Sequence, residues 1–186
     1  MPSGITHDRI TLWILPWIAG GTYGLTHHGE LTLIVSGSFL FSGLMFGPDL
    51  DIHSLQYKRW GIFRSIWLPY RKLFRHRSLF SHGLIIGTGL RVLYLFFIVA
   101  LIAIIIVAIA QLFWGFSWNW QQFAVDKLDK LTTEYFLESA AVFFGLELGA
   151  MSHSVSDWIV SSRKSRQKKK RRKNKPIPIK QTKSSK

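Results

Sequence analysis

The chain has 186 residues, enough for one domain, and carries a net charge of +14. It contains no cysteine, so disulfides and thiolate metal sites are excluded, and any bound metal must take nitrogen and oxygen ligands. Of its 24 Lys and Arg residues, 13 follow Ser162, where there is no acid, and the other 11 nearly balance the 10 acids before it. We therefore predict an apolar domain at residues 1–162 and a disordered Lys/Arg-rich tail at residues 163–186.

Four apolar stretches follow one another in the first of these parts. Residues 10–25 are rich in Trp, Leu and Gly but include Pro16, residues 31–46 carry no charge, and residues 135–151 include two acids. The strongest stretch is residues 92–114, which is 23 residues long with a single glutamine as its only strongly polar member. A helix of that length spans a hydrocarbon core of about 30 Å, although the buried helix of a soluble protein is the alternative.

The segments between these stretches carry weaker signals. Residues 27–30 indicate a short turn, and residues 117–134 have the apolar spacing of a helix. Residues 47–82 are basic and aromatic, and some of their aromatic side chains suit a membrane interface: Trp60, Trp67 and Tyr70. Small residues would permit close helix contacts in lipid: Gly37, Gly43, Gly145 and Gly149.

Charge indicates which side of the membrane each segment faces. With four spans, the N-terminus, residues 47–82 and the tail share one side, and Arg91 can extend its charge from the third span to the headgroups. That side holds 22 of the 24 Lys and Arg residues, and the other side holds only Lys127 and Lys130. The positive-inside rule places the basic side in the cytoplasm. We therefore predict an all-α, multi-pass integral membrane helical bundle of about four apolar helices, with its disordered basic tail in the cytoplasm.

Imidazole and carboxylate groups lie at the predicted cytoplasmic ends of these spans. A histidine precedes the first, two aspartates end the second, two histidines introduce the third, and a His-x-x-x-Asp pair, whose members share a helix face, ends the fourth. Taken singly, each motif also fits a turn, a lipid-contacting loop or a helix end. Together they predict one metal site, because such groups are costly near lipid unless paired or functional. Its candidate ligands are His7, Asp49, Asp51, His76, His82, His153 and Asp157. His53 is a doubtful member, and His27 and His28 fall on the opposite side.

At these motifs the sequence resembles a bacterial, largely cyanobacterial, family of uncharacterised metal-binding membrane proteins, over about residues 1–162. The resemblance rests on THDRIT, GLMFGPDLDI, RHRSLFSHG and LGAMSHSVSDW. More distantly it resembles bacterial membrane-bound proteins predicted to be metal-dependent hydrolases, which carry a Pro-Asp-x-Asp-His run and a His-Arg…Thr-His-Ser motif. Here one residue separates the second aspartate from the next histidine, and the two histidines of the third motif are six apart instead of five. The wider group has been likened to zinc-dependent phospholipase C, which implies a phosphoester substrate.

Three functions fit these observations. The first is a metal-dependent hydrolase of the bacterial inner membrane, acting on a phosphoester or lipid-linked substrate at the cytoplasmic face. It would hold one or two divalent ions, zinc being expected and manganese or iron the alternatives. Asp51 would bridge, ligate or act as base, and Arg77 would hold the anionic substrate.

In the second function, the ion is structural: it holds the helices together, and the protein catalyses no reaction. In the third, the basic tail binds anionic lipid or nucleic acid, although it has no aromatic residue for base stacking. The partners we expect are membrane lipid and an anionic lipid or phosphate-containing substrate, and we do not expect nucleic acid. The sequence predicts no oligomeric state.

Overall fold

The structure is a computed structural model that describes residues 4–74, 78, 80 and 83–173, with side chains described as far as residue 167. The described residues form helices and no β-strand, which confirms the all-α prediction. In chain order the elements are α1 (Gly4–Thr26), α2 (Gly29–Leu44), the 3-10 helix η1 (Pro48–Asp51), α3 (Leu55–Arg59), the 3-10 helix η2 (Gly61–Trp67), α4 (Leu68–Leu73), α6 (Ile86–Trp114), α7 (Trp120–Thr133) and α8 (Phe136–Lys173).

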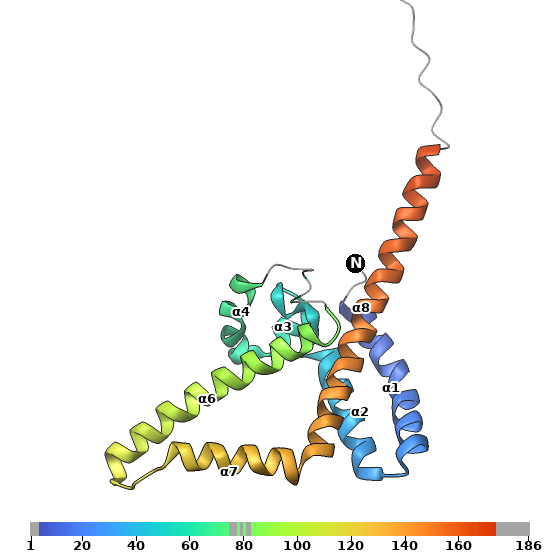
Figure 1. The fold of residues 1–186 in the computed structure, drawn as a ribbon. Helices are drawn as coiled ribbons and strands as arrows, with labels where there is room; N and C mark the ends of the chain where they lie inside the picture. The colour runs from blue at the N-terminus through green and yellow to red at the C-terminus, as the bar shows by residue number, and fades with distance from the viewer. Residues whose placement is uncertain (1–3, 75–77, 79, 81–82, 174–186) are drawn as a thin grey trace, which may run out of the picture.

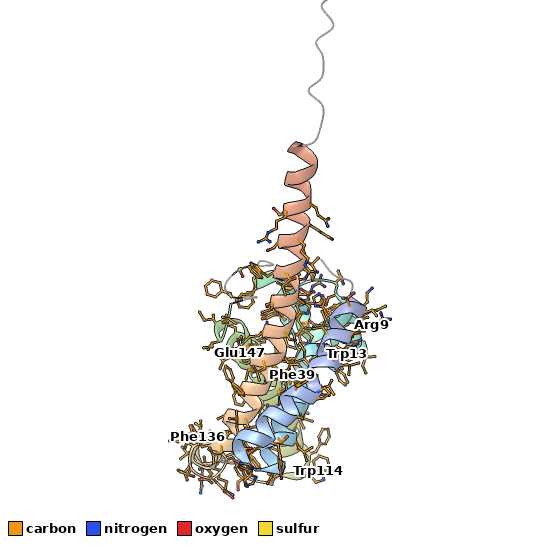
Figure 2. The ribbon with its side chains drawn as sticks, turned by 90° about the vertical axis from the view of Figure 1, so that its right-hand side faces the viewer. Arg9, Trp13, Phe39, Trp114, Phe136 and Glu147 are labelled. Atoms are coloured by element: carbon orange, nitrogen blue, oxygen red, sulfur yellow. The ribbon has the colours of Figure 1, made fainter. Side chains whose placement is uncertain are left out.

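The four long helices α1, α2, α6 and α8 run alternately in opposite directions between the two ends of the molecule (Figure 1). Helix α2 packs chiefly against α8 and α1, while α6 extends away from these three and returns through α7. The N-terminus, α3, α4 and the C-terminal half of α8 lie toward one end, and the α1–α2 turn and α7 lie at the other. A view from the side shows the same polarity, with Arg9 toward the first end and Trp114 and Phe136 at the second (Figure 2). The alternation therefore matches the order predicted from the four apolar stretches.

Small residues set the distance between α2 and α8. A Cβ on Gly145 would lie 2.4 Å from the Val35 carbonyl oxygen, and one on Gly149 would lie 2.6 Å from that of Phe39. Within this contact Ser42 donates a hydrogen bond of 2.6 Å to the Leu146 carbonyl. The two backbones can approach only because both α8 positions lack a side chain. The contact fixes the position of α8 along α2. It therefore also positions the turn of α8 that carries His153 and Asp157.

The segment between α2 and α6 builds an aromatic core. Trp67 and Tyr70 are fully buried against Phe46, and their rings meet edge-on at 5.6 Å. The prediction that they occupy a membrane interface is therefore wrong. Large aromatic rings are stabilised more by packing against one another than by a partly solvated position at an interface. Helix η1 packs against this aromatic core through the fully buried Leu50.

Two segments of the described chain are long and apolar enough to cross a membrane, instead of the four expected. They are Gly29–Asp51 and Ile86–Trp114, and none of the most apolar window of the second is buried. Length and composition alone carry this support for membrane association. Pro16 in α1 and the acids of α8 make those helices less apolar, so a four-span bundle is not confirmed.

Arg91 does not extend to a surface. Its side chain is 1% exposed, and it donates a 2.9 Å hydrogen bond to Thr88 Oγ1 one helical turn earlier. Acidic groups are within electrostatic range, Glu147 and Asp51 among them. The snorkelling expectation fails because opposite charges inside the protein solvate the guanidinium.

The boundary predicted at residue 162 stays a prediction, and it falls within helix α8. Helix α8 continues without a break to Lys173, so the first part of the expected disordered tail is helical. Lys, Arg and Gln are good helix formers, and cations near a helix C-terminus interact favourably with its dipole. Residues 174–186 lie outside the described residues.

Candidate metal centre

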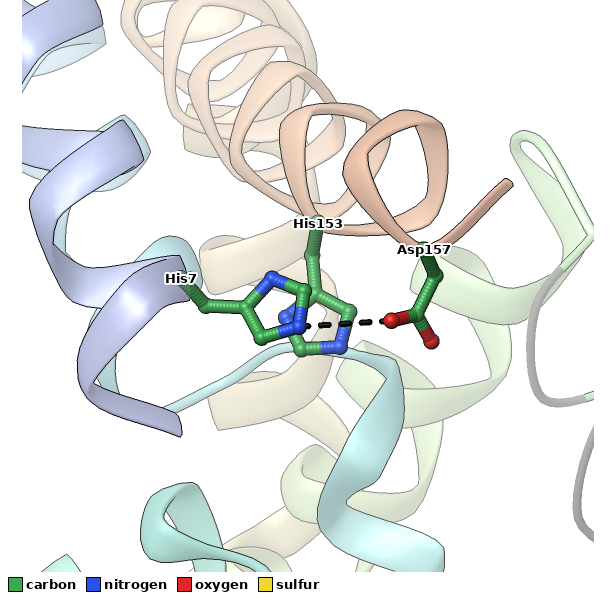
Figure 3. Close-up of side chains that lie close together, drawn as sticks. All are labelled: His7, His153 and Asp157. Atoms are coloured by element: carbon green, nitrogen blue, oxygen red, sulfur yellow. Dashed lines mark ion pairs between the residues drawn. The ribbon is translucent and has the colours of Figure 1, made fainter. Parts of the chain in front are cut away.

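The N-terminal helix and the last helix bring two imidazoles and a carboxylate together (Figure 3). One potential ligand atom from each of His7, His153 and Asp157 lies within 4.8 Å of the others. His7 Nε2 is 3.3 Å from Asp157 Oδ1, and the two imidazole rings stack with their centroids 3.9 Å apart. All three side chains are buried, at 4%, 4% and 6% exposure. His153 and Asp157 reach the same place because positions four apart share one face of α8.

A second carboxylate comes from the 3-10 helix. Asp49 Oδ2 is 3.2 Å from His153 Nε2, and its side chain is 14% exposed. Pro48 stands at the start of this helix, where a missing N–H costs nothing, and it fixes the turn immediately after α2. Three elements that are distant in sequence thus contribute to a set of two imidazoles and two carboxylates.

Ser156 fixes which nitrogen of His7 carries the proton. Its hydroxyl oxygen lies 2.8 Å from His7 Nδ1 and also 2.8 Å from the carbonyl oxygen of His153. The hydroxyl has one proton and the carbonyl can only accept, so Ser156 donates to the carbonyl and His7 Nδ1–H donates to Ser156. This assignment from the hydrogen-bond network leaves a lone pair on His7 Nε2.

That lone pair faces an acceptor. Within the described part of the chain, His7 Nε2, both nitrogens of His153 and both carboxylate oxygens of Asp157 are buried without a hydrogen-bond partner. The 3.3 Å approach of His7 Nε2 to Asp157 Oδ1 is therefore a contact between two groups that each require a positive partner. A proton or a cation between them would satisfy both.

The donor set fits a divalent metal. Two ligands bound tetrahedrally at Zn–N and Zn–O distances of about 2.0–2.1 Å stand about 3.3 Å apart. The two His–Asp separations are 3.3 and 3.2 Å. Nitrogen and oxygen ligands suit zinc, and also other first-row divalent ions. The residues present therefore fit such an ion.

The electrostatics favour the ligating form of His7. Burial lowers the pKa of His7 from its usual value of 6.5, and the neighbouring His153 imidazole lowers it further. The carboxylates of Asp157 and Asp49 act in the opposite direction and raise it. The result is a neutral imidazole at neutral pH, and only this form can coordinate a metal.

The comparison with protein families now bears on this cluster. The model of the family described as "Uncharacterized metal-binding protein (DUF2227)" matches residues 2–167. The chain belongs to this family. No curated protein and no solved structure matches the chain. Membership of a metal-binding family, together with the His/His/Asp cluster, suggests a divalent metal.

Asp51 and His53, which the sequence also suggested for the site, lie near other groups. Asp51 is 5% exposed, and it lies within electrostatic range of Arg91 and Tyr70. His53 turns toward Arg71, whose Nη1 is 3.5 Å from His53 Nδ1. The predicted ligands His76 and His82, and the predicted anion-binding Arg77, lie outside the described residues.

Sequence reasoning missed the residues that position the cluster. Arg59 donates two hydrogen bonds to the Asp8 carboxylate, of 2.8 and 2.5 Å, and a third of 2.8 Å to the Leu44 carbonyl. This bidentate pair holds α1 at the residue next to His7. Ser156 had a usable signal, because it lies three residues after His153 on the same helix face. Asp8 and Arg59 had none, since each looks like an ordinary surface charge.

Proposed function

We propose that the protein is a metal-dependent hydrolase, acting on a phosphoester or lipid-linked substrate at the cytoplasmic face of a bacterial membrane. The observation that carries the proposal is the convergence of His7, His153, Asp157 and Asp49, where the described part of the chain leaves His7 Nε2, both His153 nitrogens and both Asp157 oxygens buried without a hydrogen bond. The distant resemblance of the motifs to predicted hydrolases supports the reaction class. The predominance of Lys and Arg on the side of the cluster supports the orientation.

The chain's own residues have separate roles in this proposal. His7, His153, Asp49 and Asp157 hold the ion, and Ser156 orients His7 through its Nδ1–H. When bound, a divalent ion supplies Lewis-acid activation of water and of a phosphoryl oxygen. Asp51, buried two residues after Asp49, is our candidate for the general base. We retain the expected roles of the two histidines and the arginine between α4 and α6: His76 and His82 as further ligands, and Arg77 at the substrate anion.

A structural ion is the second candidate, and burial favours it. The three groups of the cluster are each more than nine-tenths buried, which is typical of a closed site with no position open to a substrate. An ion bound there would join α1, η1 and α8. The metal would then contribute its binding free energy directly to folding.

Turnover separates these two candidates. The metal-loaded protein is assayed against a panel of aryl and lipid phosphoesters, beside Asp51→Asn. A hydrolase loses turnover in the variant while both proteins retain the ion. A structural site gives no turnover in the wild-type protein. Chelation then reduces the free energy of unfolding by the contribution of metal binding, and the melting temperature falls. Reporter tags after residue 26 and after residue 173 test the orientation, and the second should face the cytoplasm.

A further inference from the structure

Helix α7 has an apolar side and a polar side, and none of its residues is buried. The apolar side carries residues that recur every three or four positions: Trp120, Phe123, Ala124, Leu128 and Leu131. Amide, carboxylate and hydroxyl groups lie on the other side: Gln122, Asp126, Asp129 and Thr133. A helix with this division normally buries its apolar side, yet Leu128 is 63% exposed. The apolar side therefore lacks a cover in the described part of the protein.

The apolar side of α7 faces α6 across an open space of about 650 Å³. We call this the α6–α7 space, and its α6 wall consists of Phe96, Val99, Ala100, Ala103 and Ile104. One charged residue, Lys127, is among the lining residues, and its Nζ lies 5.6 Å from the centroid of the Phe123 ring. Figure 1 shows the two helices diverging from the turn that joins them. The space is therefore apolar on both of its walls.

Helix α6 indicates what fills this space. Its 29 residues span about 44 Å, and none of its most apolar window is buried. This length exceeds a hydrocarbon core of about 30 Å, so a membrane-spanning α6 would be tilted. Figure 1 shows α6 inclined relative to α1, α2 and α8. Residues 96–104 lie in the middle of α6, so in a membrane they contact acyl chains, and the apolar side of α7 faces the same chains.

Tryptophans gather where α6 ends and α7 begins. Trp114 is the last residue of α6 and is 77% exposed. The centroid of the Trp118 ring lies 5.8 Å from that of Trp120 and 5.3 Å from that of Phe123. Trp is enriched where the hydrocarbon meets the lipid headgroups, because its ring is apolar and its N–H is polar. The residues at the start of α7 are therefore those expected at that depth.

The charges of α7 are balanced. Asp126 and Asp129 alternate with Lys127 and Lys130, which are the only basic residues of the sequence between Arg91 and Arg163. A helix that binds anionic lipid carries an excess of Lys and Arg on its polar face, and α7 has no such excess. Its charges instead suit headgroups that carry both signs. Lys127 can extend along the Phe123 ring and keep its ammonium among these headgroups.

We infer that α7 lies in the plane of the bilayer, in the leaflet remote from the metal centre, and that acyl chains of zwitterionic lipids fill the α6–α7 space. Its apolar side faces the hydrocarbon and its polar side faces water. Figure 1 shows α7 at the end of the molecule opposite α3 and α4, and lying across the direction of α8. This inference rests on the membrane location in the proposed function, and it requires no turnover.

The test uses the absence of cysteine from the chain, since a single introduced cysteine then carries a single spin label. Ala124→Cys places the label on the apolar side, and Gln122→Cys is the matched control on the polar side of the same helix. The full-length, metal-loaded protein is reconstituted in liposomes of zwitterionic lipid. Collisions of the label with oxygen, which enters hydrocarbon, are compared with collisions with a water-soluble nickel complex. The ratio of oxygen to nickel collisions should be several-fold higher at position 124 than at position 122.

The same measurement distinguishes lipid from the other possible covers of α7. A label at position 124 that is accessible to oxygen but protected from nickel supports the inference. Equal access of nickel to both positions would show that water surrounds α7, and protection of position 124 from both reagents would show a protein cover, such as a second copy of the chain. Either result would overturn the inference. Adding anionic lipid should leave the ratios unchanged, and a ratio that depends on it would contradict the zwitterionic partner.

A second substitution tests whether the apolar side holds α7 in place. In the Ala124→Cys protein, Leu128→Asp puts a carboxylate where hydrocarbon is expected, so nickel access at position 124 should rise several-fold. Gln122→Asp is the control and should leave it unchanged, because that position already faces water. Both variants should fold, since no residue of α7 is buried. An equal response of the two variants would contradict the inference.

The outcomes separate this inference from the proposed function. Nickel access to both labels, in a protein that stays in the liposomes and hydrolyses phosphoesters, would end the inference and leave the hydrolase. A lipid-exposed label at position 124, in a metal-loaded protein without turnover, would leave the interfacial helix and end the hydrolase.

Discussion

His7 Nε2 and Asp157 Oδ1 stand 3.3 Å apart, at the junction of the first and last helices, each buried and without a hydrogen bond in the described residues. The proton that would usually join such a pair is on the other nitrogen of His7, where Ser156 accepts it. An ion between the two atoms removes the repulsion between them. His153 Nε2 and Asp49 Oδ2 meet at 3.2 Å beside them, so a second imidazole and a second carboxylate are within reach of the same ion.

Removing the Ser156 hydroxyl should weaken metal binding without abolishing it. Ser156→Ala leaves His7 Nδ1–H without its acceptor, so the imidazole loses its fixed tautomer and orientation. We expect the affinity for zinc to fall by about 10–100-fold. Ser152→Ala is the control, since among the described residues the Ser152 hydroxyl donates to the Gly149 carbonyl on its own helix. Competition titration with a chelator measures both, and equal affinities in the two variants would refute the role of Ser156.

Adding one methyl group at the α2–α8 contact should destabilise the fold. In Gly149→Ala the new Cβ would lie 2.6 Å from the Phe39 carbonyl oxygen and from Ser42 Cβ, so the helices must separate. We expect a loss of about 1–3 kcal/mol in the free energy of unfolding. In Gly37→Ala, the Cβ meets nothing within 4 Å, and higher helix propensity should add up to about 1 kcal/mol. Thermal unfolding followed by circular dichroism compares them, and a neutral Gly149→Ala would contradict the packing.

Acidification should destabilise the metal-free protein. Burial lowers the pKa of folded His7 below 6.5, so the unfolded chain binds a proton at a higher pH than the folded one does. The free energy of unfolding should therefore be constant with respect to His7 above pH 6.5 and decrease as the pH falls below it. His7→Gln should remove part of this dependence. Chemical unfolding of the chelator-treated protein at several pH values measures the slope, and a stability that rises on acidification would show the pKa to be raised.

The all-helical fold and the order of the long helices were predictable because hydropathy acts over whole segments. Runs of apolar residues and the distribution of Lys and Arg gave the alternation of the helices, and the alternation placed His7, Asp49, His153 and Asp157 at one end. Figure 1 shows that end beside α3 and α4. Two of the stretches nevertheless fall short of the length and apolarity of a span. Packing against α2 favours α1 and α8 as helices without either needing a continuous apolar surface.

Individual environments were not predictable in the same way. Arg91 and Tyr70 look like interface residues in the sequence, but both are buried because acids and aromatic rings from distant elements surround them. Of the glycines chosen for close packing, Gly43, Gly145 and Gly149 have a neighbour that a Cβ would meet, whereas Gly37 faces open space. Nothing in the sequence states which face of α2 meets α8. Tertiary contacts decided each of these cases.

Elemental analysis of the purified protein tests the central claim most directly. The wild-type protein and His153→Ala are prepared in parallel, with His28→Ala as a control, because His28 is exposed at the far end of the molecule in the turn between α1 and α2. The account predicts a stoichiometric divalent ion in the wild-type protein and in His28→Ala, and its loss from His153→Ala. A wild-type protein without an ion, or a His153→Ala variant that keeps its full metal content, would contradict it.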